Sequence, residues 1–116
     1  MSETLYKICP RDAWRKAVGN GVFAGAPVDL RDGYIHFSTG AQVAETAAKH
    51  FAGERDLMLV AVDAAALGDA LKWEPSRGRA LFPHLYGPLA MTAVLSAQAL
   101  PLGPDGAHEF PQGVAT

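Results

Sequence analysis

Cysteine is almost absent from this chain of 116 residues, in which Cys9 is the only one. A single cysteine cannot form an internal disulfide, so the sequence excludes a disulfide-stabilised fold and favours a reducing compartment. Because Cys9 lies in an apolar stretch before Pro10, we interpret it as a small buried hydrophobe and not as a nucleophile.

The sequence also has little charge and no long apolar run. Charged residues make up 19% of the chain and the net charge is −2. A general nucleic-acid-binding protein needs a basic face, so we do not expect that function, although Arg77 and Arg79 could hold one phosphate. The apolar run Leu57–Val62 is too short to cross a bilayer, and residues 1–7 lack the features of a signal peptide. We therefore expect a cytoplasmic protein with no membrane partner.

Hydrophobic residues make up 49% of the chain, and their spacing predicts a single α+β domain over residues 1–103 with a loose C-terminal tail over residues 104–116. The patterns predict strands at Thr4–Cys9, Tyr34–Phe37, Leu57–Val62, Leu71–Glu74, Arg79–Tyr86 and Met91–Leu100. They predict helices at Pro10–Val18 and Gly40–Phe51, a short helix or turn at Asp63–Leu71, and an irregular segment at Gly21–Gly33.

Two of these strands carry positional information. The run Leu57–Val62 is apolar without alternation, which is typical of a strand covered on both faces, so we expect it in the centre of a sheet. Pro83 lies within a strand pattern, and proline cannot donate to a strand ladder. Its strand is therefore expected at a sheet edge or at a bulge.

The first candidate site residues lie in the segment Tyr34–Thr39. Strand alternation places Tyr34, His36 and Ser38 on one face. Thr39 and Gln42 fit a capping box at the start of the following helix, where backbone N–H groups favour an anion. A ribose or phosphate contact by His36 is one interpretation. The alternative is a structural role, with Ser38 or Thr39 capping the helix and His36 hydrogen-bonded inside the fold.

A second group of candidates follows in the segment Phe82–Pro88. Alternation places Phe82, His84 and Tyr86 together, opposite Pro83 and Leu85. Aromatic, imidazole and phenol groups on one face could stack against a base or a nicotinamide-like ring and hydrogen-bond to it. The alternative is an aromatic cluster packed under a loop.

Glu74 is the candidate carboxylate, since it follows Trp73 and precedes a Pro-Ser-Arg-Gly loop. It could stabilise a cationic sugar or act as a base, or it could simply form an ion pair with Arg77. None of the four histidines forms an H-x-x-x-H pair and no cysteine joins them, so no metal site is expected.

Several motifs together resemble a known family: D-G-Y-I-H-F-S-T, the D-L-M-L-V-A-V-D strand, K-W-E, and F-P-H-L-Y-G-P-L. The chain resembles, over about residues 4–100, an uncharacterised domain-of-unknown-function family of small bacterial and plant proteins whose fold is similar to that of ADP-ribosyltransferases. The resemblance implies a split mixed or antiparallel sheet with two or three short helices around an NAD-type cleft.

The chain is also similar, more weakly, to the RNA 2′-phosphotransferases, through Ile35-His36-Phe37-Ser38, the alanine-rich helix and the strand that ends at Asp63. That similarity carries over only His36 and Ser38, as ligand contacts. The Arg-His-Gly motif of those enzymes is missing, because the sequence here reads Lys49-His50-Phe51.

Three functions compete on these grounds. The first is binding or transfer of an NAD, ADP-ribose or phosphorylated-ribose group; NAD or ADP-ribose could be its substrate, and the sequence does not identify a cofactor. Its candidate catalytic residues are His36, Glu74 and His84, and its candidate ligand-binding residues are Tyr34, Ser38, Thr39, Trp73, Arg77, Phe82 and Tyr86. The second is a non-catalytic module that binds a small ligand or a peptide. The third is a hydrolase or lyase that uses His36 and His84 as acid and base across a substrate-sized gap.

Overall fold

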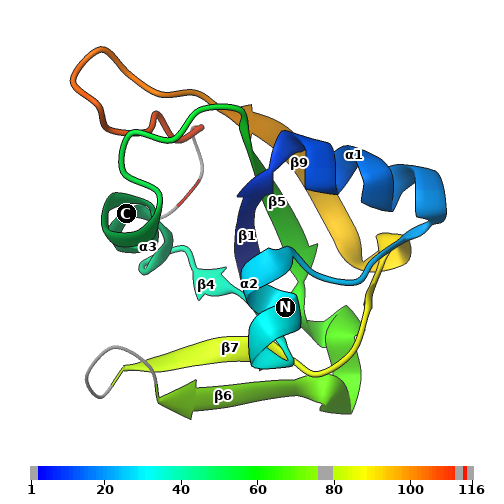
Figure 1. Cartoon of the computed structure of the whole chain (residues 1–116). Coiled ribbons are helices and arrows are strands. Elements are labelled where there is room, and N and C mark those ends of the chain that lie inside the picture. The colour runs from blue at the N-terminus through cyan, green and yellow to red at the C-terminus, as the bar shows by residue number, and fades with distance from the viewer. Residues whose placement is uncertain (1–2, 76–79, 112–113, 115–116) are drawn as a thin grey trace.

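The chain folds around a four-stranded antiparallel sheet with the order β4-β1-β5-β9 (Figure 1). Its strands are β1 (Thr4–Pro10), β4 (Ser38–Thr39), β5 (Leu57–Asp63) and β9 (Val94–Leu100). The structure is a computed structural model that describes residues 3–75, 80–111 and 114. Strand β5 pairs with β1 on one side and β9 on the other, which confirms the predicted central position of this apolar strand.

A second sheet lies beside the first and has the order β3-β7-β6. It consists of β3 (Ile35–His36), β7 (Leu81–Leu85) and β6 (Leu71–Pro75), and a separate two-stranded sheet joins β2 (Val22–Phe23) to β8 (Leu89–Ala90). Each strand pair within the described residues is antiparallel. The α+β class and the split antiparallel sheet are therefore confirmed.

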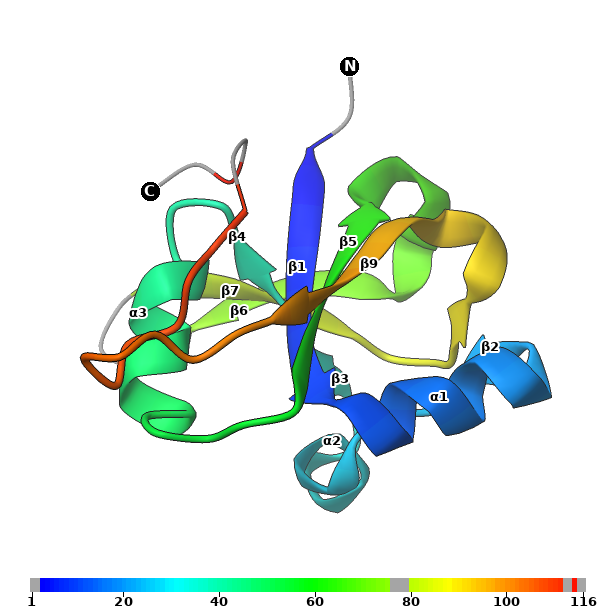
Figure 2. The same ribbon diagram turned by 90° about the horizontal axis from the view of Figure 1, so that it is seen from above.

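Short helices cover these sheets: α1 (Arg11–Asn20), α2 (Pro27–Asp32), α3 (Val43–His50), and the 3₁₀ segments η1 (Ala64–Ala70) and η2 (Met91–Ala93). Helix α1 ends at Gly21, whose φ of 82° is the left-handed conformation that glycine adopts without strain. Helices α1 and α3 lie on opposite sides of β1 (Figures 1 and 2). Among the residues described, no helix is both long and apolar enough to span a membrane.

The hydrophobic core has two parts. The larger part includes Leu5, Cys9, Trp14 and Phe23 and joins α1 to the sheets, whereas the smaller part packs Val43 and neighbouring residues of α3 against the four-stranded sheet. Cys9 has no exposed surface, which confirms its interpretation as a buried hydrophobe. Burial raises the pKa of its thiol to about 11, so the reactive thiolate is disfavoured.

The segment Gly21–Gly33 is not irregular as expected, because it contains β2 and α2. Pro27 stands at the start of α2, where its missing N–H and fixed φ are tolerated. The Asp29 side chain accepts a hydrogen bond from the Ala26 N–H at 2.8 Å and so binds one of the free donors at the helix start. The segment is too short for a hydrophobic period to be visible in its sequence.

The strand expected at Tyr34–Phe37 is interrupted at Phe37, where the chain passes from one sheet to the other. His36 pairs with His84 of β7, whereas Ser38 and Thr39 pair with Tyr6 and Leu5 of β1. Ser38 and Thr39 therefore form β4 and do not begin a helix, which corrects the expectation drawn from the capping box.

Helix α3 starts later, at Val43. Half of the capping box is nevertheless present, because the Gln42 side chain accepts from the Thr39 N–H at 3.1 Å.

Pro83 lies in β7, the middle strand of its sheet, so the expected edge position is wrong. The Pro83 carbonyl accepts from the Phe37 N–H at 3.0 Å. Since the N and C=O groups of one residue point to the same side of a strand, the proline nitrogen faces the place where β3 has ended. The missing N–H of Pro83 therefore costs no hydrogen bond between β7 and β3.

The described part of the C-terminal tail is tied to the domain. Leu102 and His108 form an isolated bridge, and His108 Nε2 lies 2.8 Å from the Glu54 carbonyl oxygen. Phe110 packs against the smaller part of the core. The boundary at residue 103 stays a prediction.

Candidate functional site

A cavity of about 430 Å³ opens where the two sheets meet, between α2 and α3. Its lining is drawn from β1, α2, α3, β7 and the crossover between β3 and β4: Tyr6, Lys7, Ile8, Val28, Arg31, Asp32, His36, Phe37, Ser38, Thr46, His50, Phe51, Phe82 and His84. Its volume falls within the range of about 300–1,000 Å³ that is typical of small-molecule pockets. Apolar and aromatic side chains line it together with charged, imidazole and hydroxyl groups.

The two candidate histidines face each other across the β3–β7 pair. His36 and His84 are register partners, and their ring centroids are 5.5 Å apart in an edge-on arrangement. The Tyr34 ring stacks on the His84 ring at 4.2 Å and lies 4.7 Å from the His36 ring. The structure thus brings together side chains that are about 50 positions apart in the sequence.

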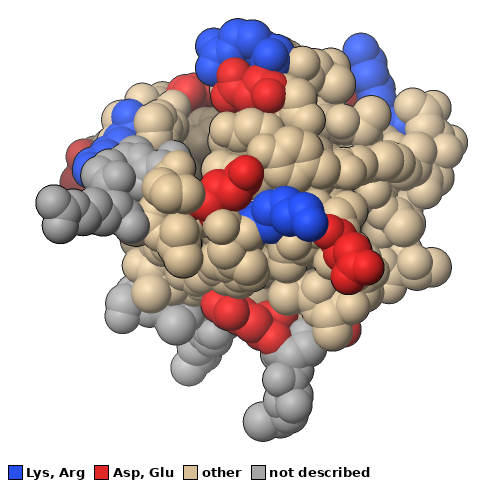
Figure 3. Space-filling view, turned by 90° about the horizontal axis from the view of Figure 1, so that it is seen from below, with Lys and Arg blue, Asp and Glu red and all other residues tan. Residues whose placement is uncertain are grey.

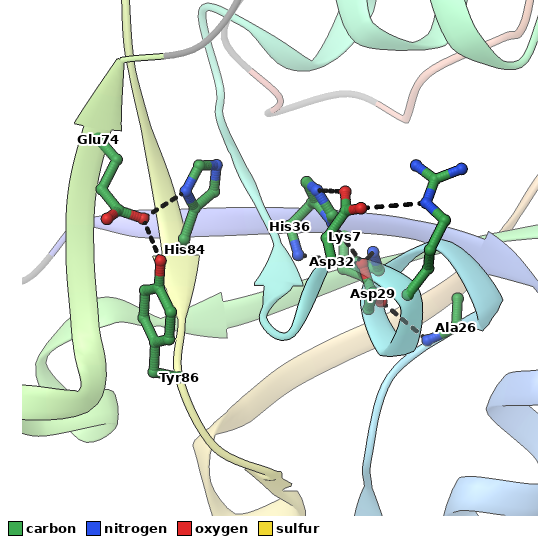
Figure 4. Close-up of polar contacts among 9 residues, drawn as sticks. Lys7, Ala26, Asp29, Asp32, His36, Glu74, His84 and Tyr86 are labelled. Carbon is green, nitrogen blue, oxygen red and sulfur yellow. Dashed lines mark hydrogen bonds and ion pairs between the residues drawn. The ribbon is translucent and has the colours of Figure 1, made fainter.

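His36 is held at both ring nitrogens. Its Nδ1 lies 2.7 Å from Asp29 Oδ1, and its Nε2 lies 3.0 Å from Asp32 Oδ2 (Figure 4). Because both partners are carboxylate oxygens, the arrangement matches an imidazolium, which donates from both nitrogens. The His36 side chain is about one third exposed and lies at the wall of the cavity.

Asp29 is the centre of a buried polar network that the sequence did not reveal. Its carboxylate accepts from Lys7 Nζ at 2.8 Å, from His36 at the ring and at the backbone N–H, and from the Ala26 N–H. Burial alone would raise the pKa of Asp29, but the His36 hydrogen bond and the Lys7 charge outweigh it and hold the pKa at about 2. Asp29 is therefore ionised.

Lys7 supplies the compensating charge from β1. Its side chain is 4% exposed, and burial lowers its pKa even though the Asp29 carboxylate opposes that shift. One sequence signal pointed to it: a lysine stands between Leu5 and Cys9 on the inward face of an otherwise apolar strand. No comparable signal marked Asp29, since its helix was not expected.

His84 has a different environment. Its Nδ1 lies 2.8 Å from Glu74 Oε1, and the Tyr86 hydroxyl donates to the same oxygen at 2.8 Å (Figure 4). The hydrogen bonds from His84 and Tyr86 lower the pKa of Glu74, and the Glu74 hydrogen bond raises the pKa of the Tyr86 phenol. His84 itself is buried, with 3% of its surface exposed, whereas the Glu74 side chain is 38% exposed.

Some of the remaining candidate residues line the cavity and others do not. Ser38 and Phe82 line the cavity, and the Ser38 hydroxyl lies 3.0 Å from Thr46 Oγ1. The cavity lining, as far as the structure describes it, does not include Tyr34, Thr39, Trp73, Glu74 or Tyr86. Trp73 alternates with Glu74 and points to the opposite face of β6, where it is 41% exposed. Arg77 lies outside the described residues, so its expected ion pair with Glu74 stays a prediction.

Comparison with known families and structures identifies the fold's relatives. A family described as a protein of unknown function (DUF952) matches residues 8–97. The chain belongs to the DUF952 family. None of the curated proteins matches the chain.

Two structures of one bacterial protein, CC0527 from Caulobacter crescentus, are similar to this DUF952 domain over nearly its whole length. The crystal structure has a TM-score of 0.91 and 48% identity, covering 97% of this chain and 99% of that one. The solution NMR structure has a TM-score of 0.80 and 51% identity over 90% of each chain. The DUF952 match includes Asp29, His36, Glu74 and His84, whereas Lys7 stands one residue before its start.

The DUF952 domain shows scattered charge on the face in Figure 3, where acidic and basic groups lie close together and no broad basic patch forms. Within residues 3–75, 80–111 and 114, no three histidine, cysteine or acidic side chains are grouped as metal ligands.

Proposed function

We propose that the cavity binds a small anionic ligand that carries a phosphorylated ribose, as ADP-ribose and NAD do. The observation that carries the proposal is the position of His36. Its ring lies on the wall of a cavity of about 430 Å³, and both ring nitrogens face carboxylate oxygens, the arrangement that suits an imidazolium. The expected similarity to ADP-ribosyltransferases agrees with such a ligand but does not carry the proposal.

Arg31 adds a second cation at the cavity wall. Its Nε lies 3.0 Å from Asp32 Oδ1, and the side chain is otherwise largely exposed. Among the described residues no partner engages its two terminal nitrogens, which can therefore bind phosphate oxygens. Asp32 thus connects Arg31 to His36 and keeps both cations on the same side of the cavity.

Such a ligand also has a sugar or a base, which needs an apolar surface, and the aromatic part of the lining provides one. Phe37, Phe51 and Phe82 line the cavity, and Ser38 offers a hydroxyl beside them. Apolar walls with a few placed polar groups are the usual composition of a small-molecule site. A ligand with a charged end and a flat or sugar-like end matches both parts.

The proposal includes two versions, binding alone and binding with turnover. A version in which His36 and His84 enclose a substrate between them is disfavoured, because the two rings contact each other edge-on at 5.5 Å and leave no gap for it. Any reaction must therefore take place on the cavity side of both rings.

Isothermal titration calorimetry tests the proposal with ribose 5-phosphate, ADP-ribose and NAD, and with ribose and nicotinamide as uncharged controls that lack a phosphate. We expect heat from the phosphorylated compounds and a large loss of affinity in Arg31→Gln. Arg15→Gln removes an exposed arginine from α1, away from the cavity, and should bind as the unmodified protein does. Absence of heat from all three phosphorylated compounds at millimolar concentration would contradict the proposal.

A further inference from the structure

We propose that the two histidines of the cavity have different tasks: His84 is the group that accepts a proton from the bound ligand, with Glu74 as its positioning residue, and His36 is a fixed cation. The identity of the ligand rests on the proposed function. The assignment of the two rings rests on their own contacts.

The tautomer of His84 follows from its partner. Glu74 Oε1 lies 2.8 Å from Nδ1 and also accepts from the Tyr86 hydroxyl. The pKa of Glu74 is lowered, so its carboxylate is ionised near neutral pH and can only accept. Nδ1 must therefore carry the hydrogen, and a neutral His84 ring has its lone pair on Nε2.

That lone pair has no protein partner. Within the described part of the chain, the His84 ring contacts Glu74 and the rings of Tyr34 and His36, and its one hydrogen bond there, to Glu74, is made at Nδ1 and not at Nε2. The ring is only 3% exposed and lines the cavity. A buried polar atom normally has a hydrogen-bond partner, so Nε2 is placed for a ligand hydroxyl or a bound water.

Two tyrosines keep the ring in this orientation. Tyr34 stacks on it with an interplanar angle of 28°, and the Tyr86 hydroxyl donates to the same Glu74 oxygen that faces His84 Nδ1. Carboxylate-bound imidazoles of this kind are oriented and stabilised as imidazolium when they take up a proton.

His36 cannot perform the same step. Both of its nitrogens are occupied by the carboxylates of Asp29 and Asp32, so no lone pair faces the cavity. Its charge can instead stabilise negative charge that is present or develops on the ligand.

The proposed step is a single proton transfer. A ribose hydroxyl, or a water bound next to it, gives its proton to Nε2, and the electron pair of the O–H bond stays on the oxygen. The ring becomes an imidazolium whose Nδ1–H remains directed at Glu74, and the oxygen becomes a nucleophile. Because His36 and Arg31 line the same cavity, the substrate class is a phosphorylated ribose with a free hydroxyl near its phosphate.

Nitrogen-15 NMR of the imidazole rings tests the assignment without any ligand, so its result does not depend on whether the proposed function is right. His84→Gln identifies the His84 signals among the four histidines. In the pH range in which the ring is neutral, we expect His84 to have its hydrogen on Nδ1. An Nε2-protonated His84 in the unmodified protein would overturn the inference.

Two variants make the test specific to Glu74. Glu74→Ala removes the acceptor, so the Nε2-protonated form should appear in that variant while the thermal midpoint changes little. Tyr86→Phe removes the other hydrogen bond to Glu74 but keeps the acceptor, and the Nδ1-protonated form should persist. If the Nδ1-protonated form persists unchanged in Glu74→Ala, Glu74 does not set the tautomer, and its assignment as the positioning residue is overturned.

Discussion

Lys7 Nζ lies 2.8 Å from Asp29 Oδ1, and the two side chains are 4% and 1% exposed. This buried pair joins β1 to α2, two elements that are 22 residues apart in sequence. Since Asp29 also binds the ring of His36, the pair fixes one wall of the cavity. The stability of the fold and the placement of the candidate site are therefore coupled through one carboxylate.

Replacing Asp29 by asparagine should destabilise the protein strongly. The substitution keeps the size of the side chain but leaves Lys7 as an uncompensated buried charge, which typically costs about 3–5 kcal/mol. Urea denaturation measures the free energy of unfolding.

Lys49→Gln is the matched control, because it breaks the exposed pair with Glu45 in α3 and should cost at most about 0.5 kcal/mol. A similar small cost for Asp29→Asn would contradict the coupling described above.

The same carboxylate predicts a pH dependence. The pKa of Asp29 is about 2 in the folded protein, below its ordinary value of 3.8. A group whose pKa is lower in the folded state stabilises the fold above the ordinary value and loses that contribution as the pH falls towards 2. The difference corresponds to about 2 kcal/mol. Unfolding free energies measured from pH ~5 to pH ~2 should fall by about that amount more in the unmodified protein than in Asp29→Asn.

Gly25 and Gly19 should respond in opposite directions to alanine. Gly25 has a φ of 129°, and an added Cβ would lie 2.9 Å from the Asp29 Cβ. Gly25→Ala should therefore destabilise the fold by more than about 1 kcal/mol through strain and displacement of Asp29. Gly19 lies in α1 with no atom within 4 Å of an added Cβ, so Gly19→Ala should stabilise by up to about 1 kcal/mol. Equal changes of the thermal midpoint in Gly25→Ala and Gly19→Ala would show that the close approach of Gly25 to Asp29 does not affect stability.

The pKa of the Tyr86 phenol reports on its hydrogen bond to Glu74. The Glu74 hydrogen bond raises the pKa of Tyr86 above its ordinary value, so Glu74→Ala should let the phenolate form at lower pH. Ultraviolet absorbance during an alkaline titration follows this change, and Tyr86→Phe identifies the signal among the three tyrosines. If Tyr86 titrates at the same pH in the unmodified protein and in Glu74→Ala, the hydrogen bond at 2.8 Å is not present in solution.

Much of the fold could be predicted from local patterns. The alternating strand Thr4–Cys9 and the apolar run Leu57–Val62 both exist, because periodicity records which face is buried. The segment Gly21–Gly33 was missed, since α2 has six residues and is held by the buried Asp29 network and not by an apolar stripe. Ser38–Thr39 was assigned to a helix start because pairing with β1 is a long-range event that a capping motif cannot reveal.

The candidate site was predictable in part. Alternation placed His36 and His84 on the correct faces, and chain pairing made them register partners. The hydrogen bonds from His84 and Tyr86 to Glu74 could not be predicted. Those contacts depend on strand register between β6 and β7, which no local pattern contains.

The most direct test of the central claim is to follow the histidine ring signals by NMR while ribose 5-phosphate is added. His36 and His84 line the cavity, and His108 is bound to the Glu54 carbonyl elsewhere. The account predicts saturable shifts of the His36 and His84 signals, with His108 unchanged and the shifts lost in Arg31→Gln. Ring signals of His36 and His84 that do not move at saturating concentration, or that move no more than those of His108, would contradict it.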